Sequence, residues 1–200
     1  YSSAKMAEFL SLFSRSDKDF LPSLIKKYPS VKDMYRFYID TWCGMKYYPN
    51  IGDCDAFALP DTVYRGVYFS KEPGLKPSVY SFLWQLFKIT GDPDFVKVIY
   101  NENGNSSEGL PYDLFASSPE KIRKETDKII MKHGKEIVSG SVNKEKWHLA
   151  ILKGNTRNNE RAFWLDYDAG GYHSHADGLN IGLFAYGLDL LPDFGYPPVQ

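Results

Sequence analysis

The chain has 200 residues and a formal net charge of -1, with 24 lysines and arginines against 25 aspartates and glutamates. This balance gives no support for binding nucleic acid through a uniformly basic surface, and no apolar run approaches the roughly 18 residues that a membrane-spanning helix needs. Aromatic residues make up 16% of the chain, including 15 tyrosines, which suits either a broad aromatic core or a cleft that stacks on flat ligands such as sugar rings. We therefore expect a folded protein with no nucleic-acid partner and no membrane span.

The cysteines and the first residues bear on redox chemistry and processing. Cys43 and Cys54 are the only cysteines, so a disulfide framework and a cysteine-ligated zinc finger are both excluded, while a single bridge stays open. The first ten residues, YSSAKMAEFL, show neither an initiating methionine nor a signal-peptide pattern. We expect a processed or excised segment.

Apolar residues recur at helical spacing through the first 135 residues. Each stripe occupies one face of a helix with a period of 3.6 residues. The stripes are Met6, Phe9, Leu10 and Phe13; Val31, Met34, Tyr35, Tyr38 and Trp42; Val79, Phe82, Leu83 and Leu86; and Ile122, Ile129 and Ile130. The third helix ends at the breaker sequence TGDP. The fourth begins at Pro119 and ends before Gly134, with Ser117 or Ser118 as its cap.

A long irregular stretch, YYPNIGDCDAFALPDTVYRGVYFSKEPGLKP, separates the second and third of these helices. A loop of this length inside a compact domain is more often functional than decorative. It carries the charged residues Asp53, Asp55 and Arg65. The structural alternative for the two aspartates is that they cap a turn after Gly52.

After residue 136 the apolar period changes to two, the period of a β-strand. KWHLAILKG is a compact apolar run, and RAFWLDYD alternates in part. LNIGLFAYGLDLLPDFG places Leu179, Ile181 and Leu183 on one face before a turn at Tyr186-Gly187. Runs of helices followed by runs of strands favour two segregated units, so we place a boundary near residue 138.

The stretch AGGYHSHADGLN sets His173, His175 and Asp177 two residues apart. In an extended chain such residues point to one side, so the three can converge on one small volume. Imidazoles and a carboxylate on one face suit a zinc-like ion. They also suit proton transfer, because histidine titrates near neutrality and a carboxylate can fix its tautomer. A polar strand end, with the histidines bonded to loop carbonyls, is the third interpretation.

The metallo-β-lactamase hydrolases have a similar sequence motif, in which a histidine pair is followed by Asp-His. Here Asp177 is followed by Gly178, and the other two histidines of the chain, His133 and His148, both lie upstream. The helical first half also does not look like an alternating αβ sandwich. These departures disfavour that class.

The run WLDYDAGGYHSHADGLNIGLFAYGLDLLPDFGYP, residues 164–197, resembles the core signature of the heparinase II/III-like polysaccharide lyases. That signature joins His-x-His-x-Asp through an alternating strand to a Gly-x-x-Leu turn and an Asp-x-Gly-Tyr. YYPNIGDCDAF and LFKITGDPDF are similar, in weaker fashion, to helical-domain stretches of such proteins. The resemblance implies an α+β multidomain fold. Residues 1–137 would be a portion of an (α/α) toroid, and residues 138–200 the first strands of an antiparallel β-sandwich that the chain truncates.

Members of this family cleave uronic-acid-containing polysaccharides, such as glycosaminoglycans and alginate, by β-elimination. The resemblance makes His173 the catalytic or charge-neutralising histidine. It makes His175 and Asp193 two ligands of a zinc ion, with a third ligand, a histidine, expected beyond Gln200. Asp177 would orient the histidines. Zinc would organise the site rather than activate water, since elimination consumes no water.

A tyrosine usually serves such lyases as base, acid or both, which requires a lowered phenol pKa. Tyr1 is one candidate, and Tyr47 and Tyr48 beside the irregular loop are the others. Asp53, Asp55 and Arg65 would line the sugar cleft, Arg65 by pairing with a carboxylate or sulfate. The resemblance also implies a periplasmic or secreted protein. Two rival functions stay open: a catalytically silent glycan-binding protein of the same fold, and a metal-dependent hydrolase.

Strand geometry makes a specific demand on the two expected zinc ligands. If Tyr186-Gly187 forms a two-residue turn, Asp193 lies opposite about Asn180. His175 then lies some five residues further along, about 16 Å at strand rise. A straight ladder would not join the ligands, so their pairing requires a bend near Asp177-Gly178, where glycine permits one.

Overall fold

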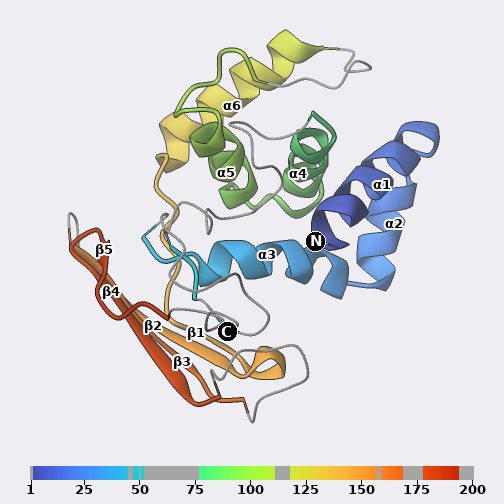
Figure 1. The fold of residues 1–200 in the computed structure, drawn as a ribbon. Helices are drawn as coiled ribbons and strands as arrows, with labels where there is room; N and C mark the ends of the chain where they lie inside the picture. Colours follow the sequence, from blue (N-terminus) through green and yellow to red (C-terminus); the bar gives the residue numbers. More distant parts are fainter. Residues whose placement is uncertain are drawn as a thin grey trace, which may run out of the picture. The chain divides into compact units, whose positions relative to one another are not determined.

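A computed structural model describes residues 2–44, 47–49, 51, 77–110, 118–156, 159–168 and 178–193, in which helices are followed by an antiparallel sheet (Figure 1). Contacts within the chain divide it into a helical unit, Tyr1–Arg36 with Tyr68–Ile137, and a sheet unit, Phe37–Val67 with Val138–Gln200. One border thus falls at residue 138. The grouping of residues 37–67 with the strands differs from the expected two-part division, in which this segment belongs to the helices.

Six helices lie in the described part of the chain. They are α1 (Ser2–Ser16), α2 (Phe20–Lys27), α3 (Ser30–Thr41), α4 (Pro77–Thr90), α5 (Asp94–Glu102) and α6 (Pro119–His133). In the helical unit, α1 contacts both α2 and α4, and α5 contacts both α4 and α6. No described helix combines the length and the apolar character that crossing a membrane requires. The helices α2 and α5 were not predicted from the sequence.

The core of the helical unit forms around α4. All four residues of its predicted stripe, Val79, Phe82, Leu83 and Leu86, are buried. The ring of Tyr35 on α3 lies 4.6 Å from that of Phe82. Burying side chains of this kind stabilises the fold by about 1.5–3 kcal/mol each. The helix ends at Thr90, and Gly91 adopts a φ of 71°, a left-handed conformation that suits glycine.

The predicted apolar face of α1 is wrong for three of its four residues, although the helix itself is present. Met6, Phe9 and Phe13 are 44, 53 and 49% exposed. The buried face is formed by Ala7, Leu10, Ser11 and Ser14. Leu10 is the one member of the predicted stripe that is buried. The other three buried side chains are small, while Met6, Phe9 and Phe13 lie exposed.

The helix α6 begins and ends where the sequence predicts. Few of its side chains are buried. The helix begins at Pro119 with Ser118 in the cap position, and Gly134 follows with a φ of 72°. The Ser118 side chain makes no capping hydrogen bond. Thr126 is the buried residue of this helix, and the predicted stripe of isoleucines is half-buried beside it.

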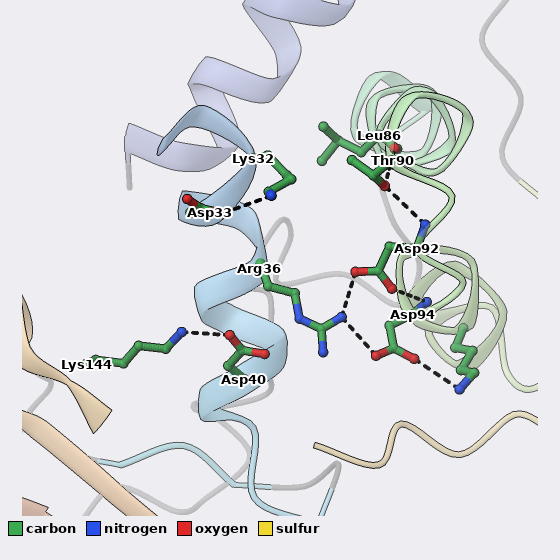
Figure 2. Close-up of polar contacts among 10 residues, drawn as sticks. Lys32, Asp33, Arg36, Asp40, Leu86, Thr90, Asp92, Asp94 and Lys144 are labelled. Atoms are coloured by element: carbon green, nitrogen blue, oxygen red, sulfur yellow. Dashed lines mark hydrogen bonds and ion pairs between the residues drawn. The ribbon is translucent and has the colours of Figure 1, made fainter. Parts of the chain in front are cut away.

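A charged cluster joins α3 to the connection between α4 and α5 within the helical unit (Figure 2). Nη1 of Arg36 donates to Oδ2 of Asp92 at 2.8 Å and to Oδ2 of Asp94 at 2.9 Å. The second oxygen of Asp94 pairs with Nζ of Lys97 at 3.0 Å. These groups are partly buried, so the cluster ties the turn after α4 to α3 more firmly than an exposed ion pair would.

The sheet unit contains a five-stranded antiparallel meander in the order β1-β2-β3-β4-β5. The strands are β1 (Val142–Lys144), β2 (Leu149–Thr156), β3 (Asn159–Asp166), β4 (Asn180–Ala185) and β5 (Leu188–Asp189). Its inner face packs into a core of Cys43, Tyr47, Leu149, Ile151, Ala162, Trp164 and Phe184. Two of these core residues come from the segment after α3, which accounts for its grouping with the strands.

The predicted face of β4 points away from this core. Ile181 is 41% exposed and Leu183 half-buried, whereas Gly182 and Phe184 are buried on the inner face. Gly182 has no side chain to contribute to the inner face. The indole of Trp164, its partner on β3, covers the glycine and fills this space. A large partner side chain thus replaces the missing one.

Candidate functional site

The hairpin between β4 and β5 confirms the predicted turn. Tyr186 and Gly187 have φ values of 56° and 73°, as a two-residue turn matched to the twist of the strands requires. The register pairs Phe184 with Asp189. The ladder ends at Asp189, and Asp193 nevertheless lies beside Asn180, since Nδ2 of Asn180 donates a hydrogen bond to Oδ2 of Asp193.

A bend precedes β4 close to the predicted place. Gly178 and Leu179 form a turn, and Leu179 has a φ of 60°. A left-handed conformation costs a bulky residue roughly 1–2 kcal/mol, and Leu179, at 75% exposure, gains little from burial in return. The chain therefore does not run straight back from Asn180. Leu179 takes up part of this bend through its left-handed conformation.

Three polar side chains line this end of the sheet on its inner face. Asp166, the last residue of β3, is 1% exposed and pairs in register with Asn180, the first residue of β4. Asn180 in turn holds Asp193. A buried carboxylate, an amide and a second carboxylate thus follow one another across β3, β4 and the segment after β5. We call Asp166, Asn180 and Asp193 the carboxylate row.

Sequence reasoning missed two members of this row. Asp166 and Asn180 were not identified, because each looks like an ordinary polar residue at a strand end. The available signal was position: Asp166 ends an apolar strand just before the histidine stretch, and Asn180 begins the next strand just after it. Side chains at adjacent ends of antiparallel neighbours lie close together. A carboxylate buried to this degree in a strand needs hydrogen-bond partners, and Oδ1 of Asp166 accepts one from the main-chain N–H of Asp168 at 3.2 Å.

The exit from β3 is held by hydrogen bonds to His148, the residue before β2, and to Asn143 on β1. The main-chain N–H of Tyr167 donates to the carbonyl oxygen of His148 at 2.8 Å. The Tyr167 hydroxyl donates to Oδ1 of Asn143 at 2.8 Å, and its ring lies 5.5 Å from that of His148. The chain is therefore fixed as far as Tyr167, six residues before His173.

Most of the residues predicted for the site lie outside the described residues: Tyr1, Asp53, Asp55, Arg65, His173, His175 and Asp177. Of the three that are described, Asp193 belongs to the carboxylate row, and Tyr47 is buried in the core of the sheet unit. Tyr48 is half-buried, and its ring stacks on that of Trp42 with centroids 6.0 Å apart. The role of Tyr48 as a catalytic base stays a prediction.

The fit of a metal ion can be judged at Asp193. A ligating carboxylate is normally itself hydrogen-bonded, and the amide of Asn180 supplies such a bond. Among the residues with described positions, no group of three or more histidine, cysteine or acidic side chains is arranged to hold a metal. Asp193 is the one expected zinc ligand among the described residues, His175 lies outside them, and the zinc site stays a prediction.

A second polar cluster lies deeper on the inner face, at the end of α3. Nζ of Lys153 on β2 donates to the carbonyl oxygens of Asp40 and Trp42 at 2.5 and 3.0 Å and to the hydroxyl of Ser139. A cation at the carboxyl end of a helix satisfies its last carbonyls and favours its dipole. Burial raises the pKa of the neighbouring Cys43 thiol from 9.0 to about 11, an effect that the charge of Lys153 partly offsets. This cluster is structural in character.

Comparison of the chain with protein-family models, with curated proteins and with solved structures yields no match. The likeness to the heparinase II/III-like lyases therefore depends on the motif in residues 164–197.

Proposed function

We propose that this chain is part of a polysaccharide lyase that cleaves uronic-acid-containing glycans by β-elimination. The motif in residues 164–197 supports this, and the hydrogen bond from Asn180 to Asp193 is the single observation that carries it. That contact brings an expected zinc ligand beside the strand that leaves the histidine stretch. Asp166 and Asn180, which precede and follow the histidine stretch in the sequence, pair across β3 and β4.

The proposed fold is a portion of an (α/α) toroid followed by the first strands of a β-sandwich. The outer face of the sheet supports the second half of this proposal. Leu152, Phe163 and Ile181, on three adjacent strands, are 63, 38 and 41% exposed on that face. An apolar sheet face of this kind is what a second layer of a sandwich covers.

The reaction removes the proton at C5 of a uronate, and the 4-O-linked sugar departs. Because negative charge builds on the adjacent carboxylate, the site must supply a group that stabilises it. His173, protonated or as a hydrogen-bond donor, takes this role. Tyr48 or Tyr1 serves as the base, and Arg65 pairs with a substrate carboxylate or sulfate.

The carboxylate row contributes rigidity to the proposed site. The Asn180 amide fixes the orientation of the Asp193 carboxylate, and the register of β3 with β4 fixes Asn180. Zinc held by His175 and Asp193 would supply positive charge and a rigid anchor for the histidine stretch. Asp53 and Asp55 line the cleft for the neutral hydroxyls of the sugar.

An ultraviolet assay tests the proposal. Elimination leaves a C4–C5 double bond conjugated to the uronate carboxylate, so absorbance should rise when the protein is incubated with alginate, chondroitin or heparan. His173→Ala should abolish the rise. His133→Ala is the matched control, because His133 is exposed at the end of α6 in the helical unit, and it should leave the rate unchanged. Release of saturated ends would instead indicate a hydrolase, and saccharide binding without product a silent glycan-binding protein.

A further inference from the structure

One tryptophan differs from the others in its environment. Of the four in the chain, Trp42, Trp84 and Trp164 are buried. Trp147 is 61% exposed. Leaving an indole in water forgoes most of the hydrophobic stabilisation that its burial would provide, so its position on the sheet unit needs an explanation.

The exposed ring is held in place and does not hang from a mobile chain. Trp147 ends the 3-10 turn Glu145–Trp147 between β1 and β2, and His148 follows in a left-handed conformation with a φ of 50°. The indole rests on the ring of Phe37, with centroids 5.1 Å apart at 38°. Phe37 in turn packs against the core on the inner face of the sheet. Trp147 therefore presents a supported aromatic surface on the inner-face side.

This surface lies at the same end of the sheet as the carboxylate row. Leu149, two residues after Trp147, pairs in register with Asp166, and Asp166 pairs with Asn180. Since neighbouring strands are about 4.8 Å apart, β2 lies about 10 Å from β4 across the sheet. The main-chain bond between His148 and Tyr167 fixes the tryptophan turn to the exit of β3. Asp193, in the segment after β5, lies one further strand spacing beyond β4, so Trp147 and Asp193 are about 15 Å apart across the sheet, the length of a short oligosaccharide.

We propose that Trp147 is a stacking subsite for one sugar ring of an acidic glycan, beside the bond that is cleaved. This rests on the proposed lyase function. The C–H face of a pyranose is apolar and flat enough to cover an indole, while its hydroxyl and carboxylate edges stay in water, so the contact buries the exposed ring without burying a charge. Phe37 beneath the indole limits its motion and lowers the entropy lost on binding.

Quenching of tryptophan fluorescence by acrylamide, a neutral quencher, tests the subsite. The three buried tryptophans are shielded from the quencher, so the accessible signal reports Trp147, and Trp147→Phe should remove it. Saturating uronate oligosaccharides should protect the accessible signal in the unaltered chain. Protection needs no turnover, so this assay reads the subsite separately from catalysis.

Steady-state kinetics give a second readout. Trp147→Ala should raise KM for oligosaccharides about tenfold, the effect of losing one stacking contact, with kcat changed less than about threefold. Tyr186→Asn is the matched control. Tyr186 is also an exposed aromatic residue, 69% exposed, but lies at the opposite end of β4, and asparagine retains the turn. This control should keep the original KM.

The outcomes separate the two proposals. Turnover without protection of Trp147 overturns the subsite and leaves the lyase standing. Protection without unsaturated product retains the subsite and overturns the lyase. Neither protection nor product, with all three glycans, overturns both. If Trp147→Ala fails to fold, protection of the unaltered chain still decides the matter.

Discussion

Replacing Gly182 by alanine should destabilise the sheet unit, because the indole of Trp164 lies over the glycine. A Cβ at position 182 would fall on Cε2, Nε1 and Cζ2 of that ring. Trp164 is buried in the core of the inner face, so the ring cannot move without disturbing its neighbours. Overpacking of this kind costs about 1–3 kcal/mol. The lower chain entropy of unfolded alanine returns about 0.4–1 kcal/mol, which leaves a net loss of roughly 1–2 kcal/mol.

Gly154→Ala is the matched control for this substitution. Gly154 lies in β2 of the same sheet, and an added Cβ there meets no atom within 4 Å. It should gain about 0.4–1 kcal/mol. Thermal unfolding measures the difference, with each kcal/mol shifting Tm by about 2–4 °C in a chain of this size. Equal Tm values for the two variants would refute the reasoning, as would a Gly182→Ala loss that persists undiminished in a Trp164→Leu background.

Three polar residues of the sheet unit, Lys153, Cys43 and Asn180, give four further expected outcomes. Lys153→Met keeps the packing of the side chain but removes the ammonium that caps α3, so urea unfolding should show a loss of about 1.5–3 kcal/mol; an unchanged midpoint would contradict the capping role. Because burial raises the pKa of Cys43 from 9.0 to about 11, its contribution to stability is fully present below pH 9 and should be lost between pH 9 and 11. Mass spectrometry should also show slow alkylation of Cys43 at pH 9 until the chain unfolds. Asn180→Ala removes the hydrogen-bond donor to Asp193. This change should lower kcat/KM on uronate glycans about 10- to 100-fold with little effect on Tm. Full activity of the variant would show that the carboxylate row has no part in the reaction.

The elements that the sequence predicts well are those in which local chemistry and tertiary packing agree. In α4, large apolar residues, the breaker after Thr90 and the buried face coincide. The hairpin at Tyr186 and Gly187 follows from turn geometry, and counting along it predicts the neighbourhood of Asn180 and Asp193 that their hydrogen bond shows. Local signals sufficed because no distant partner had to be known.

The features that sequence reasoning missed depend on the partner across an interface. Periodicity located α1 but selected the wrong face, because Ala7 and Ser11 are buried for their small size while Phe9 is left exposed. On β4, Gly182 occupies an inner position that Trp164 fills from the next strand. The carboxylate row forms only when β3, β4 and the segment after β5 lie side by side, so the sequence of any one segment does not predict it.

The central claim is tested most directly by the fate of solvent oxygen. Uronate oligosaccharides would be digested by the protein in heavy-oxygen water, and the fragments weighed by mass spectrometry. Elimination predicts two fragments whose masses sum to that of the parent, with no heavy oxygen incorporated at the cleaved bond and a double bond on the new non-reducing end. Incorporation of heavy oxygen into either fragment at that bond, with no double bond, would contradict the account.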